Sequence, residues 1–162
     1  FGVTQEAALA WRQDAVWYGV MPSSSLERTL ALPMAQPGWV FRFGVTDPAK
    51  EYIVQVVEGE IAGRMELRIP QYIEPPLADL HPLDARWEEL SNSATLLEEY
   101  AGQDSNVLAR YPNMSLDYRL VHPRKCEHPV WTLFDANHLA EPLFVMDALT
   151  QKALAGRRGH HT

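Results

Sequence analysis

One short segment gathers residue types that bind transition metals. His122, Cys126 and His128 lie between positions 122 and 128, with Arg124 and Lys125 among them. In an extended chain Cys126 and His128 would lie on one side, since strand side chains alternate between two faces. Imidazole and thiolate groups are ligands of zinc and related metals. The spacing is not that of a standard zinc motif, so a polar loop with one incidental thiol is favoured. These three residues are weak candidates for a metal site.

The same residue types offer two catalytic alternatives. Cys126 would be a nucleophile if a histidine served as its base, and the neighbouring cations would lower the pKa of its thiol. Asp135, His138 and Asp147 would form an acid–base set if folding brought them together. All three lie where turns are expected, and Asp favours turns for backbone reasons.

Motifs of several large enzyme classes are missing from the chain. It contains no phosphate-binding glycine loop, G-x-S-x-G elbow or H-E-x-x-H sequence. We therefore predict no catalytic residues, no cofactor and no enzymatic activity.

Tryptophans are the other residues that suggest a function. There are five of them, at positions 11, 17, 39, 87 and 131. Core packing is the default role for each, but tryptophan is also enriched among the residues that dominate protein interfaces. Trp11 and Trp17 would point to different sides of one helix, and Trp87 follows a proline-rich segment. Trp11 and Trp87 are therefore our candidates for binding a protein partner.

Composition narrows the class of protein. The 162 residues are 46% hydrophobic, as in an ordinary globular chain, and carry a net charge of −7. No basic stripe is available to bind nucleic acid or anionic lipid. A single cysteine excludes an internal disulfide, and no apolar run is long enough for a transmembrane helix. Because the chain begins with Phe1 and not Met, we expect a processed product or a fragment of a longer protein.

The stretch from Pro37 to Ile61 predicts the best-defined part of the fold. Aromatic and β-branched runs at 40–43 and 52–57 suit strands, and turns are expected at 46–50 and at Glu58-Gly59. From Ile61 to Ile69 apolar and charged residues alternate. Three strands joined by short loops predict an antiparallel meander with one buried face.

Helices and a linker are expected around this meander. An apolar stripe predicts a first helix from Thr4 to Met21. Four prolines between 70 and 82 predict a stiff, extended linker. A second helix is expected from Thr95 to between 108 and 111, with Asn92 near its start. Strands are expected at 114–121, 130–134, 143–146 and 153–154.

The two halves of the chain resemble each other. When Trp39 is aligned with Trp131, each half contains a helix, a proline that ends it and a strand meander that begins near the tryptophan. This similarity predicts an internal duplication. Chance similarity of two short amphipathic patterns is the alternative.

Each half also resembles the PepSY domain family, in which a helix precedes a Trp-led antiparallel sheet. Residues 129–131, PVW, match the Trp-led strand, and residues 144–154, FVMDALTQKAL, match the closing strand–turn–strand, with Gln151 where Gly is usual. The first half has GWVF at 38–41 and a shortened turn at 58–59. The resemblance implies a bacterial, extracytoplasmic or membrane-associated module that binds or inhibits a protein. The family pattern has no catalytic residues that could be assigned to this chain.

We therefore predict an α+β protein of two tandem helix-on-antiparallel-sheet units. The units are expected at residues 1–69 and 92–156, with a proline-rich linker at 70–91 and a loose tail at 157–162. The leading hypothesis for function is a non-enzymatic module that binds a protein partner in an extracytoplasmic assembly. The rival is a ligand-binding or enzymatic domain with a pocket between helix and sheet, lined by residues such as Tyr18, Arg42 or Tyr52. A metal-binding accessory protein is third.

Overall fold

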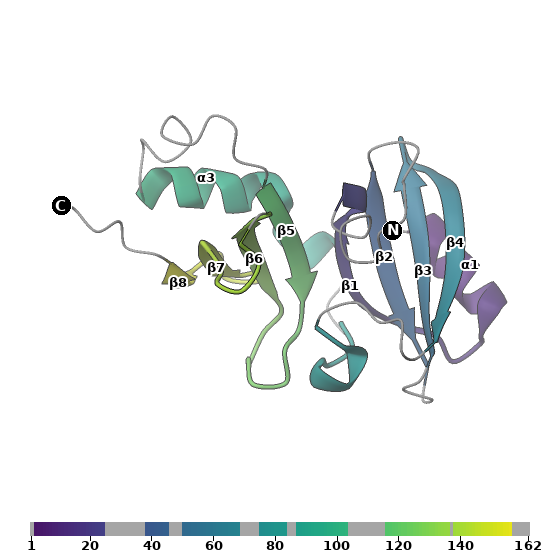
Figure 1. Cartoon of the computed structure of the whole chain (residues 1–162). Coiled ribbons are helices and arrows are strands. Elements are labelled where there is room, and N and C mark those ends of the chain that lie inside the picture. Colours follow the sequence, from purple (N-terminus) through teal and green to yellow (C-terminus); the bar gives the residue numbers. More distant parts are fainter. Residues whose placement is uncertain are drawn as a thin grey trace.

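The computed structural model of this chain contains one antiparallel sheet of eight strands (Figure 1). It describes residues 2–24, 38–45, 50–68, 75–83, 87–103, 116–136 and 138–156. In the first half lie α1 (Gly2–Trp11), β1 (Val16–Pro22), β2 (Trp39–Gly44), β3 (Lys50–Val57) and β4 (Glu60–Arg68). The short 3-10 helices η1 (Leu77–Asp79) and η2 (Trp87–Glu89) follow. The second half has α3 (Ser93–Gln103), β5 (Leu116–Val121), β6 (Val130–Asp135), β7 (Phe144–Asp147) and β8 (Ala153–Gly156).

The two halves share their sheet, so the prediction of two separate helix-on-sheet units is wrong. The strand order is β4-β3-β2-β1-β5-β6-β7-β8, with β1 and β5 side by side at the centre. They pair through Gly19 with Val121 and through Val20 with Leu120. The described part of the chain is therefore mostly β, with two short α-helices, α1 and α3. Pairing β1 with β5 also hides one edge of each half.

This error comes from β1, which lies within the helix predicted from Thr4 to Met21. The helix ends at Trp11, and Val16–Pro22 is a strand. Valine and aromatic residues at positions 16–18 favour a strand. Gly19 then lets the central strands approach, since a Cβ at Gly19 would lie 2.6 Å from the carbonyl oxygen of Leu120. This contact between distant segments overrides the helical periodicity of the sequence.

Most of the other predicted elements are confirmed. The meander of Trp39 to Arg68 forms β2, β3 and β4, and Glu58 and Gly59 make a turn with φ of 51° and 82°. All four predicted strands of the second half are present as β5 to β8, although residues 114 and 115 lie outside the described residues. The second helix is described from Ser93 to Gln103, and its predicted end between 108 and 111 lies outside the described residues. The Oδ1 of Asn92 accepts a hydrogen bond from the Thr95 N–H at 2.9 Å.

One hydrophobic core spans both halves, on the face of the sheet that α1 and α3 cover. We call it the helix face. Its buried side chains from the sheet are Trp17, Val20, Phe41, Phe43, Tyr52, Val54, Leu120, Trp131, Leu133, Phe144 and Met146. Ala8 of α1 and Leu96 and Tyr100 of α3 pack against them. Side chains of both helices and of the sheet therefore pack into one core.

The opposite face of the sheet has a different character. Its apolar cluster is small and consists of Met21, Val40, Ile53 and Leu67. Charged residues are buried beside it: Arg42 with Glu51, and Arg119 with Asp117. This face therefore holds the buried charges of the described sheet.

The segment 75–83, predicted to be part of an extended linker, is packed against both halves. Its Leu83 N–H donates to the Trp17 carbonyl, and its His81 N–H donates to the His122 carbonyl, each at 2.8 Å. Leu80, only 1% exposed, forms a bridge with Pro123. We call residues 75–83 the strap, because it ties β1 to the loop after β5.

Candidate functional site

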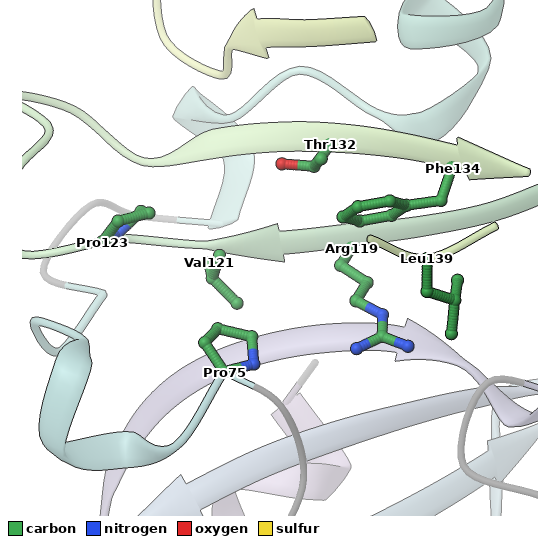
Figure 2. A pocket seen from close by; sticks show the side chains of 7 residues that line it. All are labelled: Pro75, Arg119, Val121, Pro123, Thr132, Phe134 and Leu139. Atoms are coloured by element: carbon green, nitrogen blue, oxygen red, sulfur yellow. The ribbon is translucent and has the colours of Figure 1, made fainter. Parts of the chain in front are cut away.

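A hollow among the described residues lies on the opposite face of the sheet, over β5 and β6. Its volume is about 550 Å³. Figure 2 shows the side chains that line it. The lining residues are Pro75, Arg119, Val121, Pro123, Thr132, Phe134 and Leu139. Only Arg119 and Thr132 among them carry polar side chains. We call this cavity the Arg119 hollow.

Strand alternation places its floor. On β5, Arg119 and Val121 point away from the helix face, because the alternate residues Tyr118 and Leu120 pack in the core. Pairing of β5 with β6 sets Arg119 opposite Thr132. The Pro75 carbonyl accepts a hydrogen bond from Arg42 Nη2 at 2.8 Å. This bond holds the start of the strap at the side of the Arg119 hollow.

The charge of Arg119 is balanced inside the protein. Its Nε and Nη2 donate to the two carboxylate oxygens of Asp117, at 3.2 and 3.1 Å. Asp117 is fully buried, and Arg119 is 6% exposed. The guanidinium carbon also lies 5.8 Å from the centre of the Phe134 ring, within the range of a cation–π contact. The hollow therefore presents apolar surface around a neutral ion pair.

An enzyme is expected to have a pocket lined by residues such as Tyr18, Arg42 and Tyr52. These three side chains do not converge on one pocket. Tyr52 pairs with Phe43 and packs on the helix face, whereas Arg42 pairs with Ile53 on the opposite face. Arg42 is buried in an ion pair with Glu51. Burial raises the pKa of the Tyr18 phenol, and the positive charge of Arg124 opposes this shift.

A smaller gap of about 240 Å³ does lie between α3 and the sheet. Trp39, Phe41, Asn92, Ser93 and Trp131 line it. The Trp39 and Trp131 rings meet edge to face, 6.5 Å apart, and Trp131 Nε1 donates to the Ser91 carbonyl at 2.7 Å. Asn92 caps α3. These side chains are thus engaged in packing and capping.

The weak metal candidates do not converge. His122 Nε2 lies 3.0 Å from the Cys126 carbonyl oxygen, and the His122 ring packs against His81. His128 faces away toward Asp147, with Nδ1 2.7 Å from Oδ2. In the described ranges no group of three or more His, Cys, Asp and Glu residues could hold a metal ion. Each of the two histidines instead contacts a different group within this chain.

The acid–base set of Asp135, His138 and Asp147 is split between two pairs. His138 Nδ1 lies 3.2 Å from Asp135 Oδ2 at the surface, while Asp147 pairs with His128. The hydrogen bond to Asp147 raises the pKa of His128. Burial opposes ionisation of Asp147, but bonds from the Thr150 and Leu149 amides and from His128 lower its pKa overall. Asp147 thus holds a turn together.

Of the two candidates for binding a protein partner, Trp11 already packs against and bonds to residues of this chain. Its ring stacks on Tyr52 with centroids 4.7 Å apart and an interplanar angle of 8°. Its Nε1 donates to Glu66 Oε2 at 2.9 Å. It anchors α1 to β3 and β4. Trp87 begins η2, and its side chain lies outside the described part of the structure.

Sequence reasoning missed Asp117 and Arg119 as site residues. The alternating pattern at 114–121 correctly separates them from Leu116, Tyr118 and Leu120. A carboxylate and a guanidinium two residues apart on one strand face was the available signal, since such residues are neighbours. Nothing in the pattern shows that both would be buried.

Comparisons with known proteins give a fold likeness alone. No family model matches the chain, and no curated protein sequence matches it. A crystal structure from Clostridium difficile 630, described as a "putative lipoprotein", is similar in fold, with a TM-score of 0.54 and 8% sequence identity. The match covers 94% of this chain and 88% of that one. Within the described residues, no helix is long and apolar enough to span a membrane.

Proposed function

We propose that this chain is a non-enzymatic binding module that holds a protein partner in the Arg119 hollow. The observation that carries the proposal is an apolar cavity of about 550 Å³ in which Arg119, the charged residue of the described lining, is already paired with Asp117. Apolar side chains of a partner fit such a surface, because burying them there leaves no charge unpaired. Leu139, 40% exposed at its rim, offers a further apolar contact.

The chemistry around the hollow supports binding in preference to catalysis. Among the lining residues, the polar side chains are a guanidinium and a hydroxyl, and neither is a general base near neutral pH. The packed helix–sheet core supports the same view, because the gap described within it, at Trp39, is small, about 240 Å³.

An extracytoplasmic location is part of the proposal. The fold resembles that of a protein described as a "putative lipoprotein", and lipoproteins as a class are carried at membranes. The resemblance of the sequence to PepSY domains agrees with this location. A bacterial assembly at the cell surface or in the periplasm is therefore the expected setting.

Site-specific photo-crosslinking in cells of the source organism tests the binding surface. A photoreactive residue at Leu139, on the rim, is compared with one at Leu149, which is 38% exposed in the turn after β7. We expect one protein to be crosslinked from position 139 and not from 149. Thr132→Trp, which fills the hollow, should abolish the crosslink, whereas Leu149→Trp should not. Equal labelling from both positions, or a crosslink that survives Thr132→Trp, would refute the proposal.

A small apolar molecule is the second candidate, because the volume of the hollow lies within the range of ligand pockets, about 300–1,000 Å³. Native mass spectrometry of the protein purified from its source distinguishes the two. A bound compound that is absent from Thr132→Trp would favour the ligand, and an unliganded mass would remove this candidate.

A further inference from the structure

The strand β4 ends the sheet and has a free side in the described structure. It pairs with β3 from Lys50–Arg68 to Val57–Glu60, and no described strand pairs with its other side (Figure 1). With nine residues, it is longer than the other edge strand, β8, which has four. A row of unpaired backbone groups of this length is a template for another strand.

The side chains of β4 carry a charge pattern that complements itself. Arg64 and Glu66 lie on the helix face, because they pair with Val54 and Tyr52 of the core. Met65 lies between them on the opposite face and is 39% exposed. In antiparallel pairing of two identical strands centred on position 65, Arg64 of each copy lies opposite Glu66 of the other. Met65 meets its own counterpart.

We propose that two copies of this chain associate through β4, in antiparallel register centred on Met65, so that the sheet continues from one copy into the next. The regular part of β4 contributes residues 63–67, because the register shift against β3 lies before Gly63. A register centred on position 64 would set Arg64 opposite Arg64. Like charges directly opposite destabilise strand pairs, so the charges select the register.

A second copy fits this edge better than an unrelated peptide. The strand carries two acidic residues, Glu60 and Glu66, and two basic ones, Arg64 and Arg68, so it has no net charge to attract an acidic or basic segment. Glu66 is also held in place by Trp11 Nε1 at 2.9 Å and by Arg68 Nε at 3.0 Å. This preorganised carboxylate favours a specific ion pair across a symmetric interface.

Charge exchange tests the interface by sedimentation equilibrium up to about 1 mM protein. We expect the wild-type chain to dimerise, and Arg64→Glu or Glu66→Arg each to weaken the dimer by about tenfold or more, because both variants set like charges opposite each other twice. The double variant Arg64→Glu/Glu66→Arg should restore dimerisation. An equimolar mixture of the two single variants should form heterodimers.

The controls separate the interface from folding and from net charge. Lys125→Glu changes the net charge as Arg64→Glu does but lies outside β4, and it should leave the dimer unchanged. If Glu66→Arg unfolds the chain by releasing Trp11, Met65→Lys provides a second test, since it places two cations together on the symmetry axis. A wild-type monomer throughout the concentration range, or a dimer that Arg64→Glu and Met65→Lys do not weaken, would overturn the proposal.

Discussion

The ion pair between Arg119 and Asp117 stabilises the floor of the Arg119 hollow. Removing one partner takes away the opposite charge that the other, still buried, group is paired with. We therefore expect Asp117→Ala to destabilise the protein by about 3–5 kcal/mol. The double variant Asp117→Leu/Arg119→Met, which replaces the pair by apolar groups, should be more stable than the single variant. Urea denaturation monitored by circular dichroism measures both, and equal losses would contradict this account.

His128 is expected to make stability depend on pH. Its pKa is raised above the ordinary value of 6.5, chiefly by the hydrogen bond to Asp147. A raised pKa means that the folded state binds the proton more tightly, so this stabilisation is present below pH 6.5 and is lost as pH rises through the folded pKa. The melting temperature of wild type should exceed that of His128→Gln at about pH 5.5, and the difference should shrink by about pH 8.5. A difference that grows with pH would show the opposite linkage.

At the scale of elements, the contact between β1 and β5 depends on Gly19. A Cβ there would press on the backbone oxygen of Leu120, at 2.6 Å, and a backbone atom cannot move aside as a flexible side chain does. We expect Gly19→Ala to cost about 2 kcal/mol or more in unfolding free energy. Gly102→Ala in α3 is the matched control, since apart from its chain neighbours and its own helix backbone no described atom lies within 4 Å of its added Cβ. That variant should be stabilised by up to about 1 kcal/mol. Equal effects of the two substitutions would mean that the close contact of β1 and β5 at Gly19 leaves room for a larger side chain.

At the scale of the whole molecule, the shared sheet and core predict that both halves unfold together. Residues of each half contribute to one hydrophobic cluster, and the strap bonds to Trp17 of one half and His122 of the other. Differential scanning calorimetry should therefore show a single transition, with calorimetric and van't Hoff enthalpies equal. Two resolved transitions would indicate that the halves are independent units.

The sequence alone determined most strands and turns, because their signals are local. Alternation in β4 and β5, the Glu58-Gly59 turn and the Asn92 cap depend on neighbours within a few residues, and the structure confirms each. The internal duplication and the PepSY resemblance, which also come from sequence, stay predictions.

Only the tertiary structure decided how the halves meet and where the site lies. Residues 16–21 have the periodicity of a helix, but Val16–Pro22 forms β1, because pairing on both sides, with β2 and β5, outweighs the helical pattern. The Arg119 hollow brings Pro75 of the strap against β5, β6 and the loop at Leu139, which lie far from it in sequence. Burial of Asp117 and Arg119 depends on what packs over them, and no spacing along a single strand encodes it.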